Sequence, residues 1–211
     1  MDGTRMAALV AKGYGIAAAR IGLPHTVYRS ASMFNPLQNS NQLITNFPAS
    51  MTTNYQYSAY NKPKVPDWKL IADISQLAIG DWLVGGQGTF YVADLQPLLP
   101  TPVVQCNHVV TIMRPSYSIA GSLEQTETQI ASFFPVFMQS KRDKDHSPSG
   151  FPTSTETATS LPMWITYINA HGVSDIQKND VIVDENGARY IIDVPDLTSF
   201  GYIVETHIEM P

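Results

Sequence analysis

The stretch Gly80-Asp81-Trp82-Leu83-Val84, with Gly88 and Tyr91-Val92-Ala93-Asp94 after it, occurs twice in this chain. The second copy reads Asn179-Asp180-Val181-Ile182-Val183, then Gly187 and Tyr190-Ile191-Ile192-Asp193, 99 residues later and without a gap. In both copies two runs of β-branched and aromatic residues flank a glycine turn, which predicts a β-hairpin. Asn186-Gly187 is the preferred pair for a type I′ turn. The first copy turns through Gly85-Gly86-Gln87-Gly88.

Three weaker matches extend the repeat towards the N-terminus. They pair Thr26–Arg29 with Thr111–Arg114, Phe47–Met51 with Phe134–Met138, and Pro66–Trp68 with Pro162–Trp164. Their separations are 85, 87 and 96 residues, and they change only across polar, turn-rich sequence where insertions are tolerated. The sequence therefore predicts a mainly β chain with two tandem small β-barrel or sandwich-like domains, related by internal duplication and preceded by a short α-helix.

The repeat also predicts the domain boundaries. We expect an N-terminal helix or arm over residues 1–24, a first β-domain over 25–113 and a second over 110–211. A strand at about 109–113 is expected to close the first domain and open the second. Such a shared strand leaves no flexible linker, so the domains should be rigidly oriented. Domains of roughly 90 residues bury modest cores, which mutual packing or oligomerisation would supplement.

Residues 4–21 are the convincing helical stretch of the sequence. Asp2 or Thr4 is suited to cap its start, and Gly22 followed by Pro24 to end it. Arg5, Lys12 and Arg20 supply a polar side. Apolar residues recur at helical spacing: Met6, Leu9, Val10, Gly13, Ile16, Ala17 and Ile21. Two interpretations stay open: a helix packed on its own domain, or an arm that docks on a neighbouring subunit.

Composition excludes several classes of protein. Only 15% of the 211 residues are charged, against roughly 25% in ordinary soluble domains, which suggests surface covered by neighbours. A net charge of -5 argues against binding nucleic acid through phosphate contacts. The single cysteine, Cys106, excludes an intrachain disulfide and a cysteine-based zinc site. The apolar run Ala7–Ala11 is too short for a signal peptide or membrane span, so we expect a protein made and used in soluble form.

The search for reactive residues yields no catalytic set. Cys106 and His108 lie two apart on a predicted strand, but a metal site or nucleophilic pair needs a third group, so a buried thiol beside a packed histidine is favoured. A strand follows Gly85–Gly88, so no helix N-terminus is available for phosphate. Asp81 and Asp180 are expected to bond backbone N–H groups in turns. We predict no enzyme activity, no catalytic residue, no metal site and no cofactor.

Two loops differ between the copies. Gln139–Leu161 is polar and predicts an exposed loop. The corresponding stretch Thr52–Val65 carries three tyrosines among small polar residues, which suits a contact surface but is equally compatible with a loop folded on its own domain. The candidate partner-contact residues are therefore those three tyrosines and the basic residues of the helix: Tyr55, Tyr57, Tyr60, Arg5, Lys12 and Arg20.

The repeated hairpin resembles the small β-barrel modules of tailed-bacteriophage neck and tail proteins, such as head-closure and tail-completion proteins. The residues that carry the resemblance are Gly80-Asp81, Tyr91-Val92, Asn179-Asp180 and Tyr190-Ile191. The opening Met1–Gly22, followed by Val27-Tyr28-Arg29, is also similar to the openings of phage virion proteins.

This resemblance implies a structural subunit made in the host cytoplasm and located in the virion neck or tail. It would form a homo-oligomeric ring, a trimer, hexamer or dodecamer, in the head-to-tail connector or tail passage for DNA. Adjacent connector, tail or fibre proteins would be its partners. DNA would pass through the ring without sequence-specific binding, and no membrane would be a partner. Because each chain carries two similar modules, a ring could meet a neighbour of twice its own symmetry.

Two alternatives stay open. The chain could be a baseplate or tail-fibre attachment adaptor that docks through Thr52–Val65. In another class altogether, it could be a carbohydrate-binding or enzymatic module, which would require a pocket with convergent polar groups.

Overall fold

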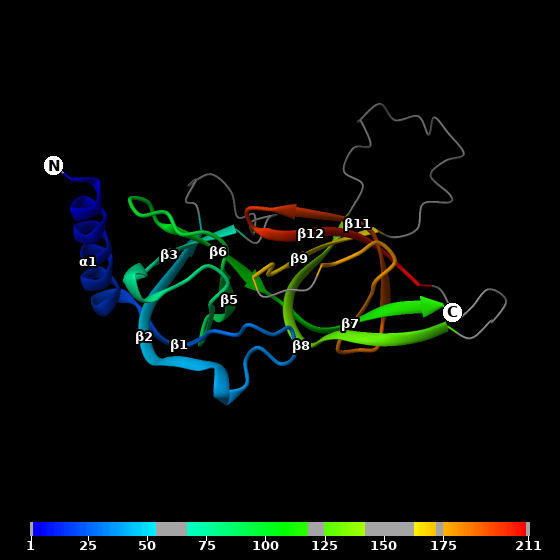
Figure 1. The fold of residues 1–211 in the computed structure, drawn as a ribbon. Coiled ribbons are helices and arrows are strands. Elements are labelled where there is room, and N and C mark those ends of the chain that lie inside the picture. The colour runs from blue at the N-terminus through cyan, green and yellow to red at the C-terminus, as the bar shows by residue number, and fades with distance from the viewer. Residues whose placement is uncertain (1, 54–66, 118–124, 142–162, 172–174, 210–211) are drawn as a thin grey trace, which may run out of the picture.

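The computed structural model describes residues 2–53, 67–117, 125–141, 163–171 and 175–209. Two closed, six-stranded antiparallel barrels lie side by side, and one helix, α1 (Gly3–Ile21), covers the outer side of the first (Figure 1). Barrel one consists of β1 (Leu23–Tyr28), β2 (Gln42–Thr53), β3 (Asp67–Ile71), β4 (Trp82–Gly85), β5 (Gly88–Val92) and β6 (Thr101–Cys106). Barrel two consists of β7 (His108–Tyr117), β8 (Gln125–Lys141), β9 (Met163–Ile168), β10 (Val181–Val183), β11 (Arg189–Thr198) and β12 (Gly201–Ile208). Two short 3₁₀ turns, η1 (Asn39–Asn41) and η2 (Ile74–Gln76), belong to barrel one.

The two barrels have the same topology, which confirms the predicted fold. The strand order is β1-β2-β3-β6-β5-β4 in one and β7-β8-β9-β12-β11-β10 in the other. Even the irregularities recur: the first pair of strands in each barrel has a bulge at the corresponding place. At this bulge Asn46 in β2 and Phe133 in β8 both have positive φ, 55° and 47°. A shared irregularity of this kind is typical of a duplicated unit, because bulges are specific features of a fold.

The second hairpin is one residue longer than the gap-free alignment predicted. Leu83 pairs with Phe90, whereas the equivalent Ile182 pairs with Tyr190. Tyr190 therefore corresponds to Phe90 and not to Tyr91, and the offset on the second strand is 100 residues. Contacts between aromatic side chains agree with the corrected offset of 100 residues. Trp68 meets Phe90 edge-to-face at 5.7 Å, and Trp164 meets Tyr190 in the same way at 5.4 Å.

The extra residue lies in the turn, where the predicted type I′ geometry is wrong. Gly187 has φ 81°, but Asn186 does not have the positive φ that a type I′ turn requires. Gly187 N–H instead donates to the Asp184 carbonyl at 3.0 Å. The Asp184 carboxylate also accepts from the backbone N–H groups of Asn186 and Ala188. This side-chain capping favours an ordinary turn closed by one left-handed glycine.

The predicted strand shared by the two domains at 109–113 is also wrong. Within the described residues, β7 pairs with β8 and β10 and with no strand of barrel one. Barrel one is already closed by β6, which pairs with β3 and β5, so it has no free edge left to accept another strand. Asn107 alone separates β6 from β7. The junction is therefore as short as predicted, although no strand is shared.

The barrels are joined by an apolar contact. Trp82, Tyr91 and Val104 project from the outer face of β4–β6 into the core cluster of barrel two. The Trp82 ring lies edge-on to Phe134 with centroids 5.4 Å apart. The buried Tyr91 hydroxyl donates to the Phe200 carbonyl at 2.7 Å. The interior of barrel one forms a separate cluster. The two barrels thus share one packed apolar interface.

Barrel two does not repeat this docking face. At the positions that correspond to Ala93 and Val104, it carries Asp193 and His207, whose carboxylate oxygen and Nδ1 lie 2.7 Å apart. A third barrel could not dock there as the second docks on the first, because it would bury this polar pair.

The helix begins and ends as predicted but packs with the opposite face. Asp2 caps α1 by accepting from Thr4 N–H at 3.3 Å, and Gly22 ends it. The residues buried against barrel one are Ala11 and Ala18, whereas the larger Met6, Leu9, Ile16 and Ile21 are exposed. Small side chains let the helix approach β2 and β3 closely.

Candidate functional site

Two arginine–aspartate clamps with buried carboxylates are the most conspicuous polar feature, one in each barrel. Arg29 donates from Nε and Nη2 to the Asp81 carboxylate, both at 2.7 Å, and Arg114 does the same to Asp180 at 2.8 Å. Both carboxylates are 1% exposed, and each also accepts a backbone N–H three residues upstream, from Ala78 or Gln177. These hydrogen bonds raise the pKa of both guanidinium groups.

The clamps confirm the turn-forming role predicted for Asp81 and Asp180 and add their arginine partners. Arg29 directly follows β1, Arg114 lies within β7, and each carboxylate directly precedes the fourth strand of its barrel, so the clamp ties the first and fourth strands together. The carboxylate lone pairs are occupied by intramolecular donors. The arrangement stabilises each barrel.

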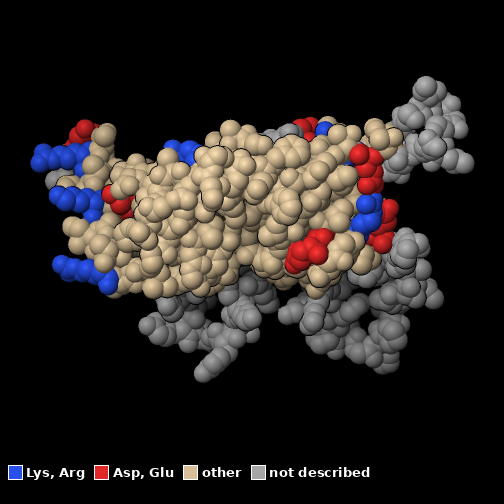
Figure 2. Space-filling view, turned by 90° about the horizontal axis from the view of Figure 1, so that it is seen from below, with Lys and Arg blue, Asp and Glu red and all other residues tan. Residues whose placement is uncertain are grey.

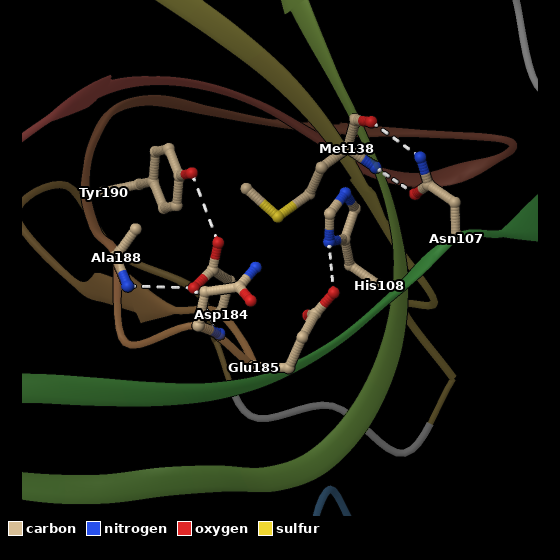
Figure 3. A network of polar contacts seen from close by, with 8 residues as sticks. Asn107, His108, Met138, Asp184, Glu185, Ala188 and Tyr190 are labelled. Carbon is tan, nitrogen blue, oxygen red and sulfur yellow. Dashed lines mark hydrogen bonds and ion pairs between the residues drawn. The ribbon is translucent and has the colours of Figure 1, made fainter.

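A second polar network lies where the barrels join (Figure 3). The Asn107 amide donates to the Met138 carbonyl at 2.9 Å and accepts from Met138 N–H at 2.7 Å. Next to it, His108 Nδ1 lies 2.9 Å from a Glu185 carboxylate oxygen. Burial of that carboxylate opposes ionisation, but its backbone hydrogen bonds and His108 lower the pKa of Glu185 overall. These contacts fix the junction to β8 and to the β10–β11 hairpin.

The hairpin half of this network is organised by Asp184. One carboxylate oxygen accepts the backbone N–H of Ala188 at 2.8 Å, and the other lies 3.3 Å from the Tyr190 hydroxyl. Burial raises the pKa of Tyr190. Tyr190 therefore remains a hydrogen-bond donor at neutral pH. The network holds the turn in place.

Cys106 and His108 do not act as a pair. Cys106 ends β6 and packs against the shared core cluster, whereas His108 begins β7 and faces Glu185. Burial raises the pKa of the Cys106 thiol far above its ordinary value, so the thiolate needed for nucleophilic attack is disfavoured. The predicted packed thiol is confirmed, but its neighbouring histidine belongs to another contact.

A small cavity of about 180 Å³ lies between the barrels, lined by residues that include Tyr91, Asn169, His171 and Phe200. The Asn169 amide donates to the Gly80 carbonyl at 2.9 Å and accepts from His171 N–H at 3.0 Å. Tyr91 is bonded to Phe200, as described above. The polar atoms that line the cavity thus hold the barrels together. Among the described residues, no group of three or more His, Cys, Asp or Glu is placed to hold a metal ion.

The surface offers a stronger candidate, an exposed phenylalanine in a strained conformation. Phe133 is 67% exposed and has φ 47°. Positive φ is readily tolerated by asparagine, which stands at the equivalent position Asn46, but is a genuine outlier for a bulky residue. Because such strain persists mainly where function requires it, Phe133 is a candidate contact residue.

Phe133 belongs to a surface almost devoid of charge. No Asp, Glu, Lys or Arg occurs from residue 30 to 61 or from 128 to 140. The β-bridge between Phe34 and Ser132 places these two segments side by side. Phe34 is itself 47% exposed. Figure 2 shows a broad face without Lys, Arg, Asp or Glu between the two ends of the molecule.

The predicted contact residues are only partly within the described structure. Arg5, Lys12 and Arg20 are exposed along α1. Tyr55, Tyr57 and Tyr60 lie outside the described residues, as does most of the predicted loop Gln139–Leu161. Its first three residues are not loop, because β8 continues to Lys141. In the same way, β2 includes Thr52 and Thr53 at the start of Thr52–Val65.

Phe133 and Phe34 were not among the contact residues predicted from the sequence. A signal was present for Phe133, because the matched anchors Phe47-Pro48 and Phe134-Pro135 are preceded by Asn46 in one copy and by Phe133 in the other. A large apolar residue in place of a turn-former could have marked the position.

Within the described residues, no helix is both long enough and apolar enough to span a membrane. Comparison with known proteins found no matching family model, no matching curated protein and no matching solved structure.

Proposed function

We propose that this chain is a structural subunit of a tailed-phage virion and forms a homo-oligomeric ring in the head-to-tail connector or tail passage. The observation that carries the assembly part of the proposal is Phe133. A bulky residue at φ 47° costs of order 1–3 kcal/mol, and its ring is 67% exposed. Covering the ring with a neighbouring subunit offsets this cost, since buried aromatic residues are frequent hot spots of interfaces.

The architecture supports a building-block role. Closed barrels have no free strand edge, so subunits must associate through side-chain faces and not by adding strands. The shared apolar packing at Trp82 and the single-residue junction at Asn107 keep the two barrels in one orientation. A rigid subunit can define a fixed rotation between neighbours, which a closed ring requires.

The distribution of charge supports a DNA passage. The uncharged segments 30–61 and 128–140 offer neither cations that would hold phosphate nor carboxylates that would repel it. A channel must let DNA slide, so a surface without phosphate-binding cations is suited to it. The resemblance of the hairpins to neck and tail modules supports the same location. The duplication would let a ring present twice as many modules as it has chains.

The alternatives have less support. In the described part of the chain, the polar groups around the cavity bond one another, which does not favour an enzymatic or carbohydrate-binding module. The adaptor hypothesis depends on Thr52–Val65, most of which lies outside the described residues.

Gold-labelled antibodies against the chain, applied to tailed virions from cells that make it, test the proposal. Label at the neck or along the tail axis is the expected result. Label on fibres or baseplate would favour the adaptor, and label absent from virions but present in cell lysate would refute the virion role.

A further inference from the structure

The helix α1 packs on barrel one with its smallest residues. Ala11 and Ala18 are buried, and a Cβ on Gly15 would lie 3.0 Å from Asp73 Cβ. At the end of the helix, a Cβ on Gly22 would lie 2.9 Å from the Ala49 nitrogen. These close approaches fix how the helix is rotated about its axis. The larger side chains of α1 therefore cannot turn inward without moving the helix away from the barrel.

The opposite side of α1 carries an apolar seam. Met6, Leu9 and Ile16 are 40, 57 and 50% exposed. Together with Gly13 they follow alternating spacings of three and four residues, the pattern by which a helix packs against a partner. A Cβ on Gly13 would have no atom within 4 Å, so the middle of the seam is open to close approach. We name Met6, Leu9, Gly13 and Ile16 the outer seam.

More apolar surface adjoins the start of the helix. Leu98 and Leu99 are 51 and 59% exposed. With the first turns of α1 they line an open groove of about 600 Å³. Large apolar residues that face solvent next to one another are characteristic of surfaces that bind another protein.

Charge identifies the partner. Arg5, Lys12 and Arg20 flank the outer seam, and Figure 2 shows basic side chains projecting from the end that α1 forms. Acidic side chains gather at the opposite end of the molecule, on barrel two (Figure 2). We name four carboxylates of barrel two the acidic rim: Glu127 and Glu209, which pair with Arg189, and Asp184 and Glu185 of the hairpin turn near the junction. Among the described residues, α1 is thus basic and barrel two is acidic.

We infer that α1 of one copy docks, through its outer seam and basic flank, on the acidic rim of barrel two of the next copy. Symmetric pairing of two α1 helices would bring like charges together, whereas head-to-tail contact sets cations against carboxylates. Repeated head-to-tail contacts close into a ring when the rotation between copies permits. The inference rests on the proposed ring and assigns one contact between copies, in addition to the contact that would cover Phe133.

Two charge-reversal variants of the full chain test the inference. One carries Lys12→Glu and Arg20→Glu on the helix, and the other carries Glu185→Lys and Glu209→Lys on the rim. Sedimentation velocity measures assembly, and circular dichroism with thermal unfolding checks that each variant folds. We expect each variant alone to assemble at least tenfold more weakly than the wild type. An equimolar mixture should regain assembly, because opposite charges then meet at every contact.

A variant of the outer seam tests the inference independently if the variant of the acidic rim does not fold. Leu9→Ser with Ile16→Ser should weaken assembly at least tenfold, whereas the control Leu197→Ser, at a residue 62% exposed on β11, should not. Unchanged assembly of both helix variants would overturn the inference but leave the ring proposal standing. The two reversal variants can alternate only around a ring with an even number of copies, so folded variants that fail to associate even as mixed pairs would also overturn the inference. A wild-type protein that is monomeric at every concentration would overturn both the head-to-tail inference and the ring proposal. Binding of α1 to lipid vesicles would not change that conclusion.

Discussion

Replacing Phe133 by asparagine, the residue that copy one has at this position, should separate folding stability from assembly. The native backbone at Phe133 has φ 47°, and the left-handed region costs roughly 1–2 kcal/mol for most residues but little for asparagine. Opposing this gain is the loss of apolar burial. The ring is 67% exposed, so about a third of the roughly 1.5–3 kcal/mol of a fully buried phenylalanine is lost.

These two contributions nearly cancel. The free energy of unfolding of the Phe133→Asn monomer should therefore lie within about 1 kcal/mol of the wild type. Assembly should behave differently, because truncating an interface hot spot costs about 2 kcal/mol or more, which corresponds to a roughly 30-fold weaker contact. Urea denaturation at low protein concentration measures the first quantity, and sedimentation equilibrium measures the second.

The reciprocal exchange is the matched control. Asn46→Phe places a bulky residue at φ 55° in barrel one and should lower stability by roughly 1–2 kcal/mol. The reasoning is refuted if Phe133→Asn lowers stability by more than about 2 kcal/mol, since the ring would then serve the fold. It is equally refuted if the variant assembles as tightly as the wild type.

Three further predictions concern the body of the molecule. Asp81→Ala and Asp180→Ala each remove a buried carboxylate that accepts charge-assisted hydrogen bonds, and each should cost about 2–3 kcal/mol, or roughly 4–12 °C in melting temperature by calorimetry. A loss confined to one copy would contradict the equivalence of the clamps. Trp82→Ala removes a ring from the contact between the barrels, so it should cost about 3–5 kcal/mol and split one unfolding transition into two. A single transition at the wild-type temperature would show that the Trp82 contact does not couple the barrels. The Cys106 thiol, whose pKa is raised by burial, should react with a thiol reagent at pH 8 at least tenfold more slowly in the native protein than in urea, and equal rates would exclude the packed position.

The repeated hairpin predicted the larger part of the fold, because its hydrophobic pattern and turn residues depend on local physics. Both halves of each clamp also lie within the matched segments, at Arg29 and Asp81 and at Arg114 and Asp180. The sequence could not show that these residues meet, since their contact depends on how β1 and the residue before β4 come together in the closed barrel.

The errors have physical reasons of their own. A turn can gain one residue without losing its glycine, so the hairpin alignment shifted by one position after Gly187. Helical periodicity identified the apolar side of α1 but not which side faces the protein. Close packing of a helix on a sheet favours small residues, so Ala11 and Ala18 are buried against barrel one whereas Leu9 is exposed to solvent. Strain at Phe133 is a property of the backbone that sequence patterns do not report.

The measurement that most directly tests the central proposal is native mass spectrometry of the purified full-length chain over a range of concentrations. A ring subunit should give one closed stoichiometry, a trimer, hexamer or dodecamer, that persists on dilution until the complex dissociates. Monomer alone at every concentration, or an open ladder of sizes without a preferred one, would contradict the proposal that this chain builds a ring.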